Sequence, residues 1–417
     1  MNRARPRPGR IGRSHPGAVL LLALLVTVAG LGAGLGLIIG LDGRRPRAST
    51  LGATLSVAEA LATTSPAGFE RALAPRPFAF PADHGPHPAF RTEWWYWTGN
   101  LRASGSGGGS RRFGFQLTFF RTALAPSVAP RPSAWAARDV YMAHLAVADV
   151  DAGRFHARDR WARRALDLSG ASGDPFRVWV GDWIAEGRAP AGQPIQLRAG
   201  DGDLRIDLRL SAAKPPVLHG ERGLSRKSAE AGNASYYYSL TRMPVSGEVH
   251  LGDRAFVVEG LGWMDREWST SALAPDQVGW DWFALQLDDG RELMLYRLRQ
   301  RDGGTSPASQ GTLVAADGAA RALDRDAVEV QVLDHWLSPR GATRYPARWR
   351  LRVPASGLEL VVTPLLPDQE LDLAVRYWEG AVRVDGTADG RPLAGVGYVE
   401  LVGYASPARG PVEAVRQ

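Results

Sequence analysis

The chain has 417 residues, 45% of them apolar and 22% charged, so it is long enough to bury one large core or two medium ones and is not a disordered protein. The formal charge of +7 comes from the first 47 residues, which hold eight arginines and one acid, while the remainder carries 42 basic and 42 acidic residues. A body without net charge has no electrostatic basis for binding nucleic acid. The absence of cysteine excludes disulfides, thiolate metal sites and cysteine nucleophiles.

The first predicted element is a transmembrane helix over residues 18–41. These 24 residues carry no charge, and at 1.5 Å per residue they reach about 36 Å, enough to cross a bilayer. No clean cleavage site precedes Asp42, so a retained signal anchor is favoured over secretion after cleavage. The basic residues 1–17 would then lie in the cytoplasm, and the body would face the periplasm or the exterior. This predicts a single-pass protein of the cytoplasmic (inner) membrane.

Glycines at several small-xxx-small spacings within this span would also allow a helix–helix dimer. Residues 42–82 are rich in Ala, Pro, Ser and Thr and are expected to form a linker.

The body opens with a strand, Glu93 to Thr98, that carries aromatic rings on both faces. Prolines at 86 and 88 prevent a helix before it. The alternation of a strand places Trp95 and Trp97 on one face and Trp94 and Tyr96 on the other. Each aromatic face must be covered, either by a core or by a large apolar ligand.

The rest of the body consists of short strand-like runs separated by turns, with no long amphipathic helix. The Gly-Ser-rich residues 104–110 are expected to form a hairpin tip. This spacing is typical of an all-β barrel or sandwich and not of a parallel α/β sheet. The expected strands between residues 140 and 263 are Val140–Asp149, Gly153–Trp161, Phe176–Ile184, Ile195–Ala199, Leu204–Leu210, Tyr236–Thr241, Gly247–Leu251 and Ala255–Trp263.

The second half echoes the first. Trp280 to Tyr296 repeats a tryptophan-rich strand and its hairpin partner, and the run from Gly260 to Asp265 is matched by the run from Gly395 to Glu400. Such self-similarity predicts a duplicated unit, with tandem antiparallel barrels over residues 83–270 and 276–405. The short connection between them favours a fixed interface, and interfaces of this kind are preferred ligand sites.

Six ordered motifs carry a specific resemblance. They are Phe90 to Gly99, Gln116 to Arg121, Ala143 to Ala146, Tyr237 to Arg242, Gly262 to Trp268 and Gly397 to Leu401. The chain resembles the lipocalin-like family that includes AttH-type proteins, often labelled predicted secreted hydrolases, and carotenoid 1,2-hydratases (hydroxyneurosporene synthases). The resemblance spans about residues 80–405 and implies two lipocalin-like barrels with a site at their junction.

One position departs from this family pattern, because the secreted subgroup usually has histidine where this chain has Arg266. Relatives in the family also differ in activity and include enzymes for cyclisations of the Diels–Alder type. Fold alone therefore does not fix the function.

Asp265 and Glu267 are the candidate catalytic residues. Strand alternation puts both on the face of Trp263, with Arg266 on the opposite face. Hydration of an isolated double bond needs a carboxylic acid that is still protonated near neutral pH, and burial beside tryptophans supplies one. Aromatic faces stabilise the cation that follows. The competing interpretation is an ion pair with Arg266 that closes a barrel rim.

The candidate ligand-binding residues are mostly tryptophans, about half of which are expected to be core instead. A buried ion pair between Arg91 and Glu93 is favoured over contact of either with a ligand. His84 and His87, with Asp83, resemble the corner of a metal site in a short loop stiffened by proline. A third ligand is not evident in the sequence, so no metal or cofactor is predicted. The candidate ligand-binding residues are Trp95, Trp97, Trp263, Trp268, Trp280, Trp282, His144 and Tyr237.

These observations predict a membrane-anchored protein that binds a hydrophobic lipid or isoprenoid between its barrels, with a hydratase-like lyase or isomerase as the enzymatic form. The alternative is a non-catalytic carrier that works with an ABC-type membrane transporter. Serine hydrolase chemistry is not supported, since no Gly-x-Ser-x-Gly elbow occurs.

Overall fold

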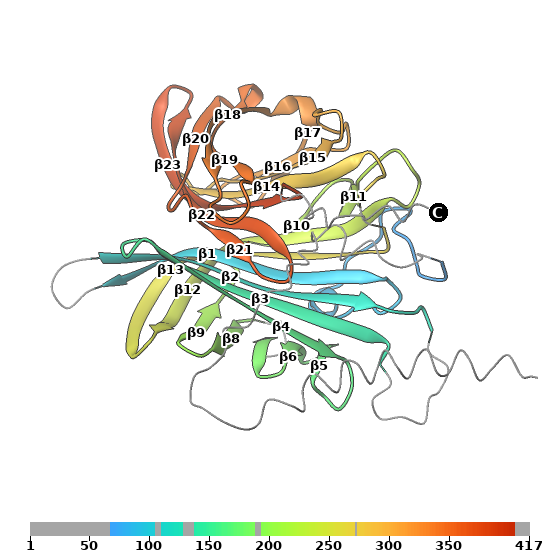
Figure 1. Ribbon diagram of the computed structural model, residues 1–417. Helices are drawn as coiled ribbons and strands as arrows, with labels where there is room; N and C mark the ends of the chain where they lie inside the picture. Colours follow the sequence, from blue (N-terminus) through green and yellow to red (C-terminus); the bar gives the residue numbers. More distant parts are fainter. Residues whose placement is uncertain (1–66, 105–109, 128–136, 188–192, 272, 405–417) are drawn as a thin grey trace, which may run out of the picture. The chain divides into compact units, whose positions relative to one another are not determined.

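The computed structural model describes residues 67–104, 110–127, 137–187, 193–271 and 273–404 (Figure 1). They form two antiparallel, barrel-like sheets, which confirms the predicted all-β class. Both sheets belong to one compact unit, Ala53–Gln417. The predicted transmembrane span, residues 18–41, falls outside the described residues. Within the described ranges, no helix combines the length and the apolar character that a bilayer span requires.

The first sheet has 13 strands within the described residues, and its main path runs β4-β3-β2-β1-β13-β12-β9-β8-β7-β6-β5. Its strands are β1 Thr92–Ser104, β2 Ser110–Ala123, β3 Asp139–Asp149, β4 Arg154–Arg163, β5 Ser169–Gly173, β6 Phe176–Val180, β7 Trp183–Gly187, β8 Ile195–Asp201, β9 Leu204–Leu210, β10 Val217–Leu218, β11 Leu224–Arg226, β12 Ala234–Leu251 and β13 Arg254–Ser269.

The second sheet has 10 strands among the described residues, and its main path runs β17-β16-β15-β14-β23-β22-β20-β19-β18. Three short 3-10 helices, η1 Ala82–His84, η2 Arg325–Ala327 and η3 Pro354–Ser356, complete the described elements. The strands are β14 Gln277–Leu287, β15 Glu292–Gln300, β16 Gln310–Val314, β17 Ala320–Asp324, β18 Glu329–Leu337, β19 Arg344–Val353, β20 Leu358–Pro364, β21 Glu370–Asp372, β22 Arg376–Ala388 and β23 Arg391–Val402.

The structure joins two of the predicted strands into one and divides another into two. The runs Tyr236–Thr241 and Gly247–Leu251 are parts of the single strand β12, which continues across an irregularity between Leu240 and Met243. The run Phe176–Ile184 is instead two strands, because a turn at Gly181, with φ of 61°, reverses the chain. A bulge and a tight turn are local backbone events that hydrophobic alternation does not reveal.

The closing strands of the two sheets are arranged in the same way. In the first sheet Tyr96 of β1 lies opposite Asp265 of β13. In the second sheet Trp282 of β14 lies opposite Glu400 of β23. The repeated sequence therefore places an aromatic residue beside a carboxyl at corresponding positions of the two sheets.

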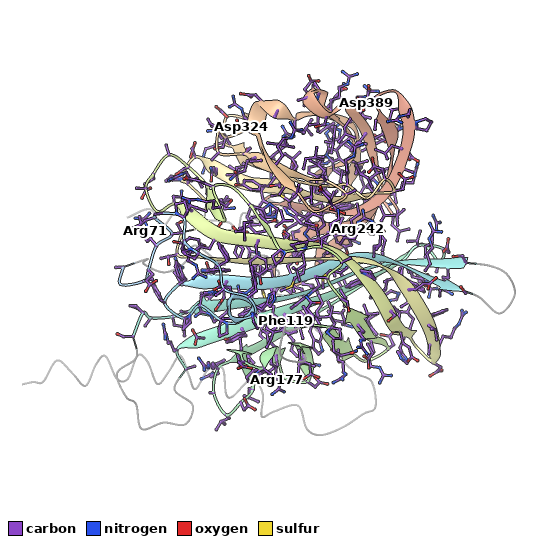
Figure 2. All side chains as sticks on the ribbon, turned by 180° about the vertical axis from the view of Figure 1, so that it is seen from behind. Arg71, Phe119, Arg177, Arg242, Asp324 and Asp389 are labelled. Atoms are coloured by element: carbon purple, nitrogen blue, oxygen red, sulfur yellow. The ribbon has the colours of Figure 1, made fainter. Side chains whose placement is uncertain are left out.

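Each sheet encloses a core of its own, and a third apolar cluster lies where the sheets meet. Trp95 and Trp97 are fully buried in the first core, and Trp349 and Trp378 belong to the second. Figure 2 shows how densely side chains fill the described region and labels Phe119, a member of the first core. The third cluster holds Tyr96, Tyr237, Trp263, Trp282, Ala284, Met294, Tyr296, Leu298, Ala381 and Tyr398.

The described end of the predicted linker packs against the first sheet. Phe78 contacts Trp268 with 5.6 Å between the ring centroids. Ala72 is fully buried in the same cluster, and the backbone oxygen of Ala74 accepts a hydrogen bond from Tyr236. Residues from Ala67 onward thus form part of the body that carries the first sheet.

Candidate functional site

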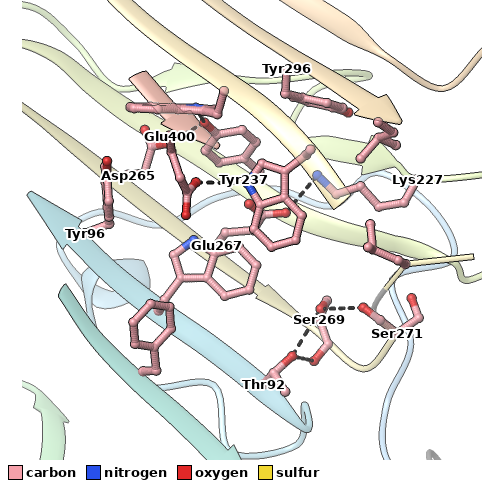
Figure 3. Close-up of a pocket in the computed structure, with 16 residues that line it drawn as sticks. Thr92, Tyr96, Lys227, Tyr237, Asp265, Glu267, Ser269, Ser271, Tyr296 and Glu400 are labelled. Atoms are coloured by element: carbon pink, nitrogen blue, oxygen red, sulfur yellow. Dashed lines mark hydrogen bonds and ion pairs between the residues drawn. The ribbon is translucent and has the colours of Figure 1, made fainter. Parts of the chain in front are cut away.

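A cavity lies in the region where the two sheets meet (Figure 3). Its volume is about 110 Å³, of the order of the ~150 Å³ cavity that holds a benzene molecule. Its wall is largely aromatic with a few carboxyl and hydroxyl groups. The lining residues are Thr92, Trp94, Tyr96, Phe120, Lys227, Tyr237, Asp265, Glu267, Ser269, Ser271, Leu273, Trp280, Trp282, Tyr296, Leu298 and Glu400.

Asp265 is held by hydrogen bonds to both of its oxygens. Tyr237 donates its hydroxyl to Oδ2 at 2.5 Å, while Ser239 Oγ and Trp263 Nε1 donate to Oδ1 at 2.5 and 2.6 Å. Trp282 Nε1 donates in turn to the Tyr237 hydroxyl at 3.0 Å, so one donor of this cradle comes from the second sheet. The three strands β12, β13 and β14 therefore fix the position of this carboxyl.

Burial raises the pKa of the Asp265 carboxyl from 3.8 to about 7, although the bonds from Ser239, Tyr237 and Trp263 act in the opposite direction. Asp265 is 5% exposed, so its ionised form loses most of the solvation that water would give it. A substantial fraction of this carboxyl is therefore protonated at neutral pH and able to act as an acid.

The surroundings of Ser239 accommodate both protonation states of Asp265. Ser239 Oγ lies 2.6 Å from Nε2 of His219, whose Nδ1 lies 2.9 Å from Thr312 Oγ1. Burial lowers the pKa of His219 to about 3, so its ring is neutral and Nε2 can accept a hydrogen bond. When Asp265 carries a proton, Ser239 can accept from it and turn its own hydroxyl hydrogen to His219.

Glu400 brings a second carboxyl into the cavity from the second sheet. Trp280 Nε1 donates to its Oε2 at 2.9 Å. Burial raises the pKa of Glu400 to about 7, and the nearby Asp265 and Glu267 carboxylates act in the same direction. In Figure 3, Asp265, Glu400 and Tyr96 lie toward one end of the cavity and Ser271 toward the other.

A third carboxyl, Glu379 of β22, lies behind Tyr96 and does not line the cavity. The Tyr96 hydroxyl donates to Glu379 Oε2 at 2.8 Å, a bond that joins the two sheets. Burial raises the pKa of Glu379 well above its ordinary range. Burial therefore favours the protonated, uncharged form of this carboxyl.

Glu267 and Lys227 form an ion pair at the wall of the cavity, with 2.9 Å between Lys227 Nζ and Glu267 Oε1. Lys227 Nζ also lies 4.3 Å from the centroid of the Tyr296 ring. Burial lowers the pKa of Lys227, but Glu267, Tyr296 and Asp265 together outweigh this and the net shift is upward. Glu267 is thus engaged by a cation that sequence reasoning did not assign to it.

Several predicted site residues lie together at this cavity. Asp265, Glu267, Tyr237, Trp280 and Trp282 line it. Trp263 is buried behind it and holds Asp265.

Four others lie elsewhere. Trp95 and Trp97 point into the first core on the opposite face of β1. Trp268 stacks on His87 with 3.6 Å between the centroids. His144 is fully buried, and its Nδ1 lies 2.7 Å from the hydroxyl of Tyr377.

The predicted ion pair between Arg91 and Glu93 is wrong. Glu93 is fully buried and forms ion pairs with Arg121 and Arg266. In the register of the sheet, Arg121 of β2 stands directly opposite Glu93. Asp265 does not pair with Arg266, because Arg266 lies on the opposite face of β13, with its guanidinium carbon 3.9 Å from the Trp95 ring centroid. The departure from the family pattern at this position therefore lies outside the cavity wall.

Within the described ranges, no three His, Cys, Asp or Glu side chains are grouped so that they could hold a metal ion. Asp83 instead accepts hydrogen bonds from Arg76, the Ala79 amide and His87. The cavity combines two carboxyls of raised pKa, Asp265 and Glu400, with aromatic walls. Such a site can transfer a proton to an apolar molecule and stabilise the cation that forms.

Sequence reasoning missed His219, Ser239, Lys227 and Glu400 as members of the site. Lys227 carried a signal, because it is one of only two lysines among 50 basic residues. Glu400 carried another, because the repeated run Gly395 to Glu400 ends on a carboxyl at the position of Asp265. Nothing in the sequence marked His219 and Ser239 as site residues, because a single polar residue in a strand or turn is common in any protein.

The AttH-like family model matches residues 71–404. An AttH protein of known structure from Nitrosomonas europaea is 37% identical, and the match covers 80% of this chain and all of that one, with a TM-score of 0.71. Kievitone hydratase from Nectria haematococca shares the fold at 14% identity over 81% of this chain and 97% of its own, with a TM-score of 0.61. No curated protein matches the sequence. The match over residues 71–404 and the 37% identity show that the chain belongs to the AttH-like family.

Proposed function

We propose that this protein binds the apolar end of a lipid or isoprenoid between its two sheets and adds water to, or moves, a double bond there. The observation that carries the proposal is the Asp265 carboxyl, with a pKa of about 7, facing an aromatic cavity. Asp265 supplies the proton. The faces of Tyr96, Tyr237 and Trp282 stabilise the carbocation that forms.

The size of the cavity restricts the group that reacts. A volume of about 110 Å³ holds on the order of five or six carbons, by comparison with a cavity that holds benzene. A polyene or acyl chain would therefore enter by one end. Its remainder would extend past the half-buried rings of Trp94 and Trp280. The hydratase activity named for kievitone hydratase belongs to a protein that shares only the fold, so the proposal rests on the site itself.

The test begins with the ligand that the protein itself retains. Solvent extraction of the purified full chain and mass spectrometry identify a co-purifying apolar molecule, which is then incubated with the wild type and with Asp265→Asn. We expect the wild type to add the mass of one water or to shift a double bond. The variant should lose 10²- to 10⁴-fold in rate, as expected when a general acid is removed, and keep the ligand.

The second candidate function is a non-catalytic lipid carrier that works with an ABC-type membrane transporter. It is supported by the same apolar wall and by the Lys227–Glu267 pair, which could hold a polar head group. No turnover in the wild type, with the ligand retained equally by the wild type and Asp265→Asn, would favour this carrier over the enzyme.

We also propose that the two sheets are lipocalin-like barrels tethered by residues 18–41 to the cytoplasmic membrane, with the body outside. The uncharged 24-residue span after five arginines supports this orientation. The full chain should then sediment with membranes after a high-salt wash, and protease added from outside the cytoplasmic membrane should digest the body. Recovery of the full chain in the high-salt wash, and not in the membrane pellet, would contradict the tether.

A further inference from the structure

We propose that Glu400 is a second catalytic carboxyl of this cavity and that Asp265 and Glu400 share one proton as an acid–base pair. The catalytic part of this proposal rests on the proposed function, whereas the sharing of the proton does not. The pair is formed by one carboxyl from each sheet.

The duplication of the sheets produces this pair. Asp265 ends the run that starts at Gly260, and Glu400 ends the matching run that starts at Gly395. Asp265 lies opposite Tyr96 across the β1–β13 pairing, and Glu400 lies opposite Trp282 across the β14–β23 pairing. All four side chains line the same cavity. Because β1 packs against β23 and β12 packs against β14 where the sheets meet, corresponding positions deliver two carboxyls to one space.

The hydrogen bonds of the two carboxyls differ and suggest different tasks. Both oxygens of Asp265 are bonded by protein groups. Glu400 receives one bond, from Trp280 to Oε2, and among the described residues Oε1 has no hydrogen-bond partner. Oε1 is therefore free to accept a proton from a water molecule. Glu379 is excluded from this role because it does not line the cavity and its Oε2 is bonded by Tyr96.

The reaction of the pair balances. Asp265 gives its proton to the less substituted carbon of the double bond, which leaves a cation on the other carbon. A water oxygen bonds to the cation, and Glu400 takes the proton that the water loses. Transfer of that proton from Glu400 back to Asp265 restores the pair. The net change is the addition of one water.

Several other titratable groups lie around the pair. Burial raises the pKa values of Tyr96, Tyr237 and Tyr398, and of Glu379. The net shift of Lys227 is upward and that of His219 is downward. The remaining neighbours are Glu267, paired with Lys227, and Tyr296, bonded to Ser225.

Infrared spectroscopy of the full chain tests the shared proton without any substrate. The carbonyl stretch of protonated carboxyls is followed against pH in the wild type, Asp265→Asn, Glu400→Gln and the control Asp385→Asn. Asp385 is an exposed residue of β22. In the wild type we expect the intensity of this stretch to fall in a step near neutral pH. Replacement of either Asp265 or Glu400 should move the step to lower pH by about one unit, because the negative charge of the neighbouring carboxylate is removed. The control should leave it unchanged. An identical step in the wild type and Glu400→Gln would overturn the pairing.

A second measurement tests the role of Glu400 with geraniol in D₂O as the probe. We expect Asp265→Asn to lose both hydration and deuterium incorporation. Glu400→Gln should keep deuterium incorporation at carbon while hydration falls about 10²-fold or more. Hydration at the wild-type rate in Glu400→Gln would overturn the catalytic role. A wild type that leaves the probe unchanged would count against the proposed function, while the infrared titration would still decide whether the two carboxyls share a proton.

Discussion

At the scale of single residues, Asp265 is held in a place that suits chemistry and costs stability. Its carboxyl has a pKa of about 7 in the fold, against 3.8 ordinarily. In the unfolded chain it loses its proton from about pH 4 upward, while in the fold it keeps the proton to about pH 7. Its contribution to stability is therefore fully present below pH 4 and is lost as the pH rises to 7. The full loss is roughly 4 kcal/mol.

We expect Asp265→Asn to remove this pH dependence, since an amide does not ionise. Between pH 5 and pH 8 the free energy of unfolding of the variant should rise relative to the wild type by about 2–3 kcal/mol. Urea unfolding at both pH values measures the difference, with Asp385→Asn as the control. If the free energies of unfolding of the variant and the wild type differed by the same amount at pH 5 and pH 8, the pKa of Asp265 would not be raised in the fold.

The sequence allowed part of this site to be predicted. Strand alternation correctly put Asp265 and Trp263 on one face of β13 and Arg266 on the other. It could not decide which aromatic face of β1 meets the cavity, because both faces carry rings of similar size. The structure places Trp95 in the first core and Tyr96 in the cavity wall. That choice depends on where the second sheet docks, which is a long-range property.

At the scale of elements, β1 is anchored at its start by charges that come from its neighbours. Glu93 pairs with Arg121 of β2 and Arg266 of β13 and accepts the backbone N–H of His87 at 2.9 Å. Burial would raise the pKa of Glu93, but the two guanidinium groups outweigh it and hold the pKa below its usual range. The expected partner Arg91 lies nearby in sequence, whereas the real partners are set by cross-strand neighbours.

Replacement of Glu93 by Gln should destabilise the protein strongly, because two buried guanidinium groups lose their counter-charge. We expect a loss of about 3–5 kcal/mol in the free energy of unfolding at neutral pH. Urea unfolding measures it, and Glu329→Gln, an exposed site on β18, should change stability by less than about 0.5 kcal/mol. Equal stability of the two variants would contradict an anchoring role for Glu93.

At the scale of the whole described body, the two sheets are joined by buried polar contacts as well as by apolar packing. Glu292 of β15 is fully buried and pairs with Lys214 and Arg242, both from the first sheet's part of the chain. Arg242 lies at the irregularity of β12, which turns it toward the second sheet, and it is labelled in Figure 2. Gln286 adds hydrogen bonds to the backbone oxygens of Thr241 and Gly262. The duplication predicted a junction, but the bulge that supplies Arg242 left no pattern in the sequence.

These contacts predict that the body unfolds as one cooperative unit, because separation of the sheets would expose Glu292, Lys214 and the cavity carboxyls together. Calorimetry of the full chain should show a single transition. Glu292→Gln should lower its midpoint by several degrees without dividing it, since loss of a buried counter-charge costs about 3–5 kcal/mol. Glu359→Gln, an exposed site of the second sheet, serves as the control. Two transitions, of which Glu292→Gln shifts only one, would contradict this prediction and show that each sheet is stable alone. The contact between the sheets, and with it the cavity, would then be less stable than either sheet.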